Sequence, residues 1–376
     1  MARPLEGVRV VDLSHVIAGP LASLYLAQLG AEVIKVEPVQ GEIMRPHPGF
    51  EAMNAGKRSI AVDIRTPAGA SAIRELARTA DVFIENYRPG VVARYGLDEP
   101  AIRALKPDIV YCSISGYGQE GEWSGRSAYD HVVQALTGMM MTSGESPDAP
   151  PLKVGFPVID VAAGMLGALS IIASLRRRDI EGKGQKVDVS MVQAALMLMY
   201  QFTSACLATG QSPERLGNRG FSGSPTADTY ECADGWLATA ANTPSQFREF
   251  TRALGLEALC EDARGLDLEA FNAVNGGFVV ARDFDYLRQK FRAALRTRSA
   301  AQMEAALNAV GVPAARVRTL GEFLLEAPGR VTLPVFDLGK AKTSGLGFTL
   351  REDGGPVPGG APALGADNAV FLRHSN

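Results

Sequence analysis

Short apolar runs, each bounded by Gly, Pro or polar residues, recur along the first half of the chain. Such runs predict buried strands, and the segments between them, with helical spacing of apolar positions, predict helices. The expected strands are residues 8–13, 32–37, 59–63, 81–85, 109–115 and 186–190, and the expected helices between the first five are residues 19–29, 66–79 and 100–105. This alternation predicts an α/β fold with a doubly wound, mostly parallel (Rossmann-like) sheet.

The pattern changes near Gly210. Two strand-like segments flank the turn at residues 233–235, which predicts a hairpin, and helical spacing fills residues 244–310. The tail is rich in Gly and Pro, with short strands that we expect to return to the first domain. We therefore expect a large domain of residues 1–205 completed by 320–376, a small α+β domain of residues 220–315, and linkers at 206–219 and 316–319.

Two long apolar segments, residues 158–175 and 191–207, contain polar or small residues and are expected to be helices in a protein core rather than membrane spans. The first carries Asp160 at its head, and no other charged residue follows until Arg176. A carboxylate there costs free energy to desolvate unless it caps the helix or takes part in chemistry. The segment alone does not decide between these two roles.

Composition excludes several classes of function. The 376 residues carry a net charge of −3 without basic tracts interleaved with aromatic residues, which argues against a nucleic-acid partner. The four cysteines and four histidines form no ligand-like cluster, so we expect no metal. Unpaired cysteines and an N-terminus without the apolar core of a signal peptide lead us to expect a cytoplasmic protein that does not bind membranes.

One motif is misleading. Gly116, Gly118 and Gly121 follow an expected strand with the GxGxxG spacing of dinucleotide-binding loops. However, residues 122–126 do not open a helix, no acidic residue stands about 20 positions later at the end of a strand, and the unit is not the first of its sheet. We therefore expect no NAD.

Nine segments in order carry a family resemblance, and they extend over nearly the whole chain. They are LEGVRVVD (5–12), AGP (18–20), LGAEVIKVE (29–37), NAGKRS (54–59), ENYRPG (85–90), SGYG (115–118), the Asp160 segment (155–164), GVPAA (311–315) and PALG (362–365). With them the chain resembles the class III CoA-transferases, the family that includes formyl-CoA transferase and related acyl-CoA racemases.

The resemblance implies a nucleophilic role for Asp160. In that family the aspartate attacks an acyl-CoA thioester, and the reaction passes through an acyl-aspartyl anhydride and an aspartyl-CoA thioester. The helix N-terminus is expected to keep the carboxylate ionised. For the oxyanions we expect backbone amides of a Gly/Ser loop, which contains Gly220, Ser222 and Gly223.

The resemblance also implies CoA as co-substrate and a set of contacts to it. For each basic residue taken singly, a solvated surface charge stays the alternative. The expected contacts are Val16 through its backbone, Lys57 and Arg58 as phosphate partners, and Asn86, Tyr87 and Arg94 by position; Arg88 is expected to be a structural neighbour.

Two departures from formyl-CoA transferases affect substrate choice. This chain has Ile17 where those enzymes carry Gln, and residues 220–225 replace their run of glycines. We therefore expect succinyl-CoA as donor and a C4–C5 dicarboxylic acid as acceptor. The family fold further implies an interlocked homodimer.

Two alternatives stay open. The racemase branch needs a His–Asp pair, and its His falls on Tyr129 here, whereas His131 is two residues away on another face of that helix. A non-catalytic acyl-CoA-binding protein is the other alternative.

Overall fold

The computed structural model describes residues 3–220, 223–273, 277–350 and 359–372. Contacts divide the chain into two compact units. The first comprises Met1–Met140, Lys153–Pro213 and Leu333–Asn376, and the second comprises Met141–Leu152 and Glu214–Thr332.

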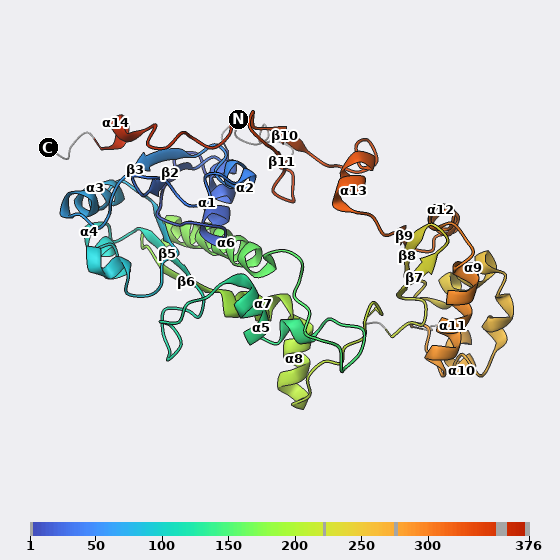
Figure 1. Ribbon diagram of the computed structural model, residues 1–376. Helices are drawn as coiled ribbons and strands as arrows, with labels where there is room; N and C mark the ends of the chain where they lie inside the picture. Colours follow the sequence, from blue (N-terminus) through green and yellow to red (C-terminus); the bar gives the residue numbers. More distant parts are fainter. Residues whose placement is uncertain (1–2, 221–222, 274–276, 351–358, 373–376) are drawn as a thin grey trace. The chain divides into compact units, whose positions relative to one another are not determined.

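The first unit is built on a six-stranded sheet in which every pairing is parallel (Figure 1). In spatial order its strands are β3 (Arg58–Ala61), β2 (Glu32–Glu37), β1 (Arg9–Asp12), β4 (Val82–Glu85), β5 (Val110–Ser115) and β6 (Lys186–Ser190). This is the order of doubly wound nucleotide-binding sheets, with a switch point between β1 and β4. The sheet confirms the mixed α/β class predicted from the sequence.

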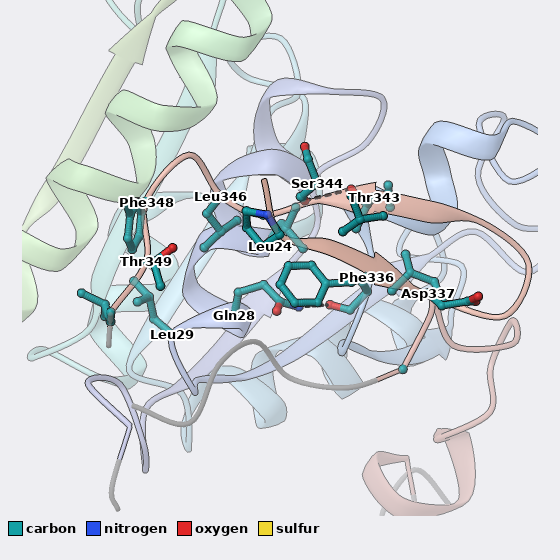
Figure 2. A pocket seen from close by; sticks show the side chains of 18 of the residues that line it. Leu24, Gln28, Leu29, Phe336, Asp337, Thr343, Ser344, Leu346, Phe348 and Thr349 are labelled. Carbon is teal, nitrogen blue, oxygen red and sulfur yellow. Dashed lines mark hydrogen bonds between the residues drawn. The ribbon is translucent and has the colours of Figure 1, made fainter. Parts of the chain in front are cut away.

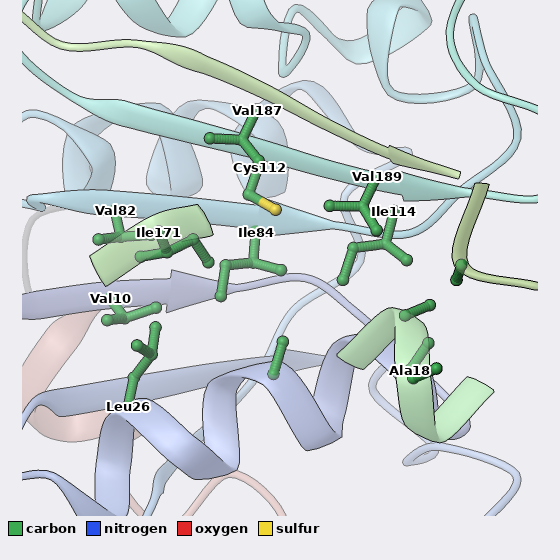
Figure 3. Close-up of a cluster of buried hydrophobic side chains, with 14 of the residues drawn as sticks. Val10, Ala18, Leu26, Val82, Ile84, Cys112, Ile114, Ile171, Val187 and Val189 are labelled. Carbon is green, nitrogen blue, oxygen red and sulfur yellow. The ribbon is translucent and has the colours of Figure 1, made fainter. Parts of the chain in front are cut away.

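Helices cover both faces of this sheet. On one face, Leu26 of α1 (Ala18–Gln28) and Ile171 of α6 (Val158–Glu181) pack against Val10 and Ile84, as Figure 3 shows. On the other face of the sheet, a second hydrophobic core includes Ile73 of α3 and Ile102 of α4. The remaining elements of this unit are α2 (Pro48–Met53), α3 (Pro67–Ala77), η1 (Val92–Tyr95), α4 (Glu99–Leu105), α5 (Asp130–Leu136), α7 (Met191–Leu198), α8 (Tyr200–Thr209), β10 (Val335–Asp337), β11 (Lys342–Ser344) and α14 (Asn368–Phe371). The short helix η2 (Met139–Met141) spans the boundary between the first unit and the second.

α6 lies unusually close to α1. A Cβ atom on Gly164 would lie 2.7 Å from the carbonyl oxygen of Ala18, so only glycine permits this approach. α6 is long and apolar enough to span a membrane, but half of its most apolar stretch is buried within the protein. The close packing brings the first turn of α6 next to the loop that follows β1.

The helix expected from Met191 onward is broken. α7 and α8 meet at an angle of 87°, and Met199 separates them. Nothing in the sequence marks this position, because no Gly or Pro stands there. After the break, α8 has no buried residue.

The second unit contains an antiparallel sheet of β7 (Asp228–Cys232), β8 (Gly235–Thr239) and β9 (Ala314–Arg316). Phe247, Phe250 and Phe291 meet edge to face in its core. Its helices are α9 (Pro244–Leu254), η3 (Glu257–Glu261), α10 (Leu268–Asn272), α11 (Phe284–Leu295), α12 (Ala300–Ala309) and α13 (Leu320–Glu326).

Candidate active site

A cavity of about 130 Å³ opens at the carboxyl edge of the parallel sheet. The loops after β1 and β4 contribute His15, Val16, Asn86 and Tyr87 to its lining, and α6 contributes Asp160. Open α/β sheets bind ligands at this edge, near the switch point of the strand order. The structure therefore brings four of the residues predicted from the sequence into one pocket.

Asp160 does not cap its own helix. Asp130 of α5 does so instead, since its Oδ2 accepts hydrogen bonds from the backbone N–H groups of Ile159 (2.7 Å) and Asp160 (3.1 Å). Gln134 donates to the other Asp130 oxygen. The carboxylate of Asp160 makes no hydrogen bond to any residue that the structure describes. The sequence left two roles open for Asp160, capping and chemistry. Because Asp130 caps the helix, capping is excluded.

The electrostatics of Asp160 differ from expectation. Burial and, secondly, the Asp130 carboxylate raise its pKa to about 6. These effects oppose the stabilisation expected from the helix N-terminus. At pH 7 the carboxylate form still exceeds the acid form by about tenfold. Asp160 is therefore ionised at neutral pH, as predicted, but it is a weakly solvated and more basic carboxylate than the sequence suggested.

The loop after β1 is strained at Val16. Its φ of +70° makes it the one non-glycine residue with positive φ in the described part of the chain. A β-branched residue in this region costs on the order of 1–3 kcal/mol, and such strain concentrates at functional sites.

Buried charges hold Val16 in this conformation. The Val16 N–H donates to Glu42 Oε1 at 2.7 Å, and Lys35 Nζ lies 2.6 Å from Glu42 Oε2. Lys35 also donates to the Ser14 carbonyl at 3.0 Å. Because the Val16 N–H is already engaged, the carbonyl oxygen is the atom of its backbone left for a ligand.

Asn86 clamps the same loop. Its side-chain amide accepts from the His15 N–H at 2.9 Å and donates to the His15 carbonyl at 2.8 Å. The Tyr87 ring lies 5.0 Å from the His15 ring, and burial lowers the pKa of His15. Nδ1 of His15 is buried and has no partner among the described residues. Buried polar atoms are nearly always hydrogen-bonded, so a ligand or a water molecule is the expected partner of this nitrogen.

Lys57 is buried rather than exposed to phosphates. Its ammonium donates to Ser23 Oγ at 2.7 Å, Pro20 O at 2.9 Å and Asn54 Oδ1 at 2.9 Å, and pairs with Asp12 at 3.3 Å. Its side chain has no exposed surface. This geometry favours a structural role, in which Lys57 ties β1 and α1 together beneath the strained loop.

The other two basic residues predicted to contact CoA do not line this pocket. Arg58 begins β3 at the opposite edge of the sheet and pairs with Asp367 at 3.3 Å. Arg94 lies exposed on η1. Both contacts stay predictions that the pocket itself does not support.

The predicted oxyanion segment belongs to the second unit, and Ser222 lies outside the described residues. The Gly220 N–H donates to the Ala227 carbonyl at 2.7 Å, and the Gly223 N–H donates to the Gly220 carbonyl at 3.3 Å. Both amides already have acceptors, so use as oxyanion donors requires the segment to exchange these bonds.

Sequence reasoning missed four contributors to the site, one of which is His15, whose Nδ1 has no partner in the part of the chain that the structure describes. Glu42 and Asp130 act on the backbone of residues far away in the chain, and Arg126 lies in the loop with the misleading glycine motif. Of these residues, only Asp130 lies in the segment that the racemase alternative singles out. It stands between Tyr129, at the position of the racemase histidine, and His131. His131 is exposed and does not line the pocket, whereas Tyr129 does.

A larger cavity of about 580 Å³ lies elsewhere in the first unit, between α1 and the β10–β11 hairpin. Figure 2 shows its mainly apolar lining, including Leu24, Leu29, Phe336 and Phe348. The described residues contain no group of His, Cys, Asp and Glu side chains suited to a metal ion. The chemistry-bearing pocket is therefore the smaller one around Asp160.

Comparison with known proteins gives a family. The sequence profile described as CoA-transferase family III matches residues 5–368. The chain is 39% identical over 280 residues to the succinate–glutarate CoA-transferase of Agrobacterium fabrum, covering 69% of each protein. It is 31% identical over 385 residues to the succinyl-CoA–D-citramalate CoA-transferase of Chloroflexus aurantiacus, covering 97% of this chain and 92% of that protein. The crystal structure of a CAIB/BAIF family protein from Brucella suis matches with a TM-score of 0.86 at 28% identity, covering both chains completely.

Proposed function

The chain belongs to CoA-transferase family III, and we propose that it transfers CoA from succinyl-CoA to a C4–C5 dicarboxylic acid such as glutarate. The relatives named above act on succinate, glutarate and D-citramalate, which supports acids of this size and charge. The observation that carries the proposal is the Asp160 carboxylate, which lies in a pocket at the carboxyl edge of the sheet while Asp130 performs the capping role.

In the proposed reaction, the Asp160 carboxylate attacks the thioester carbonyl of succinyl-CoA and CoA leaves as the thiolate, giving a succinyl-aspartyl anhydride. The thiolate attacks the aspartyl carbonyl of this anhydride, releases succinate and forms an aspartyl-CoA thioester. The acceptor carboxylate then attacks that thioester and again frees the thiolate. Attack of the thiolate on the acceptor carbonyl yields the new acyl-CoA and regenerates Asp160.

The raised pKa of Asp160 supports this role. A carboxylate that is poorly solvated is more basic and more nucleophilic than one in water, and it stays ionised near neutral pH. Each addition step develops an oxyanion that needs donors. We propose the segment containing Gly220, Ser222 and Gly223 as their source.

For CoA we propose contacts with the Val16 carbonyl, Asn86 and Tyr87. The unpartnered Nδ1 of His15 in the same pocket is a further polar atom available to the ligand. The strain at Val16 supports the proposal, because the protein maintains it with two buried charges, Lys35 and Glu42.

We also propose that the enzyme is an interlocked homodimer that works in the cytoplasm. α8 exposes Tyr200 (63%), Phe202 (41%) and Leu207 (83%), and α6 exposes Leu169 (64%), which is more apolar surface than two helices usually leave in water. The four free cysteines fit a reducing compartment. Sedimentation equilibrium that returned the mass of one chain would contradict the dimer.

The test is a transfer assay in which the purified protein is incubated with succinyl-CoA and glutarate. Formation of glutaryl-CoA, followed by chromatography, and its loss in Asp160→Asn would support the proposal. Solvent deuterium entering the α-position of a 2-methylacyl-CoA, without transfer to any acid, would instead favour a racemase. Binding of CoA without either reaction would favour a non-catalytic protein.

A further inference from the structure

The loop of residues 116–128, which contains the GxGxxG spacing, lines one side of the Asp160 pocket and is held in place by several contacts. The Gly118 N–H donates to Ser115 Oγ at 3.0 Å, and the Gln119 N–H donates to Asp188 Oδ2 at 2.9 Å. A Cβ atom on Gly116 would lie 2.2 Å from the Ala128 side chain, so glycine permits a close return of the loop. The two hydrogen bonds tie the start of the loop to β5 and β6, and the close approach of Gly116 and Ala128 brings the two ends of the loop together.

Within this loop, an aromatic ring orients the guanidinium group of Arg126. The group lies 4.2 Å from the centre of the Trp123 ring, and Trp123 in turn meets Tyr117 edge to face at 6.3 Å. The backbone N–H of Arg126 also donates to the Trp123 carbonyl at 2.9 Å. Stacking on an aromatic face orients a guanidinium but leaves the N–H groups at its edge available to an anion.

Arg88 lines the same pocket from the loop after β4. Its Nη1 donates to Ser127 Oγ at 3.2 Å, next to Arg126 in the chain. Neither arginine has a carboxylate within 4.0 Å among the described residues. Elsewhere in this unit Arg45 pairs with Glu37, and Arg178 pairs with Asp81. Arg88 and Arg126 are both exposed, lack acidic partners in the described part of the chain and line the pocket that holds the nucleophile, so their charges are available to an anionic ligand.

We propose that Arg88 and Arg126 bind the distal carboxylate of the dicarboxylic substrates and thereby select them over monocarboxylic acids. The inference rests on the proposed function, in which one carboxyl carbon reacts at Asp160 while a second carboxylate of the same acid stays charged. Arg126 presents the planar N–H edge that matches a carboxylate, and Arg88 adds a second charge. The other anions with this chemistry are the phosphates of CoA itself.

The experiment separates these two sources of negative charge. Arg88→Gln and Arg126→Gln are compared with the wild type, using succinyl-CoA against butyryl-CoA as donor and glutarate against pentanoate as acceptor. These pairs have equal chain length and differ in the distal carboxylate. Arg78→Gln, at the exposed C-terminal end of α3 and paired with Glu75, is the matched control for loss of one positive charge.

We expect each pocket variant to lower kcat/KM about tenfold to a hundredfold for the dicarboxylic substrates, the usual loss for a hydrogen bond to a charged group. The kcat/KM for butyryl-CoA and the calorimetric Kd for free CoA stay unchanged. Arg126→Lys keeps the charge but loses the planar edge, so we expect its kcat/KM for the dicarboxylic substrates to lie between those of the wild type and Arg126→Gln. Unchanged CoA affinity also establishes that a variant is folded, even where the wild type does not use butyryl-CoA.

Two results would overturn the inference. Equal losses for dicarboxylic and monocarboxylic substrates, together with weaker binding of free CoA, would assign the arginines to the phosphates. Unchanged kcat/KM for all substrates would assign them to neither anion. Failure of the proposed function is a different outcome, since the wild type would then transfer no CoA from succinyl-CoA to glutarate.

Discussion

Replacing Asp160 by Asn is expected to abolish transfer and, at neutral pH, to stabilise the protein. Burial and the nearby Asp130 carboxylate raise the pKa of Asp160 from 3.8 to about 6, so the ionised side chain is disfavoured in the folded state. Asparagine has nearly the same shape and carries no charge. The substitution therefore removes the nucleophile and an unfavourable charge in one step.

The magnitude follows from the pKa difference between the folded and unfolded states. A pKa of about 6 against 3.8, at about 1.4 kcal/mol per unit, gives an upper limit of about 3 kcal/mol. Because the folded state holds its proton more tightly, stability falls as pH rises from about 4 to about 6. The advantage of the variant is therefore small at pH 4 and nearly complete above about pH 6. Partial exposure of Asp160 reduces the expected gain to about 1–2 kcal/mol.

The assay is thermal unfolding of wild type and variant between pH 4 and pH 7.5. A gain of about 1–2 kcal/mol corresponds to a rise in Tm of about 2–8 °C for a unit of this size. Asp63→Asn is the control, because hydrogen bonds from Arg65 lower the pKa of that carboxyl, so its removal does not stabilise. An Asp160→Asn variant with unchanged or lower Tm at pH 7.5, or with the same gain at pH 4, would contradict the raised pKa of Asp160.

Three further predictions concern the same site. Transfer activity should fall as pH drops through about 6, because Asp160 becomes protonated. Asp130→Asn should move this limb of the pH–rate profile to lower pH, because the Asp130 charge no longer raises the pKa of Asp160. A limb that does not move would contradict the repulsion between the two carboxylates. Val16→Gly should raise the free energy of unfolding in urea by about 1 kcal/mol, because relief of the strain at positive φ exceeds the entropy of the new glycine; a loss of stability would contradict the strain. Lys57→Met should lower that free energy by about 3–5 kcal/mol, because it leaves the buried Asp12 carboxylate without its cation; a stable variant would contradict the structural role of Lys57.

The sheet could be predicted because each strand is a short segment with clear breaks that buries at least two successive or alternating residues; β4 and β5 are buried throughout. β6 has the predicted bounds of residues 186–190, and β2 those of residues 32–37. The break at Met199 could not be predicted in this way. Helical spacing of apolar residues continues through it, and the bend leaves α8 without a buried face.

The candidate site was only partly visible in the sequence. Asp160 stood out because a single charge heads an apolar helix, and Asn86 and Tyr87 because they carry the family resemblance. The electrostatics were not visible, since they arise from side chains distant in the chain. Asp130 caps a helix 30 residues away, and Glu42 holds Val16 from 26 residues away. Lys57 looked like an exposed cation because sequence does not reveal burial of a single lysine.

As the proposed nucleophile, Asp160 forms a covalent bond to the substrate during transfer. The most direct measurement is the intact-protein mass after brief exposure to succinyl-CoA, with peptide mapping and the Asp160→Asn variant as control. We expect a mass increase in the wild type that hydroxylamine removes and that maps to the peptide with Asp160, and no increase in the variant. An active wild type without an adduct on that peptide, or an equal adduct in the variant, would contradict it.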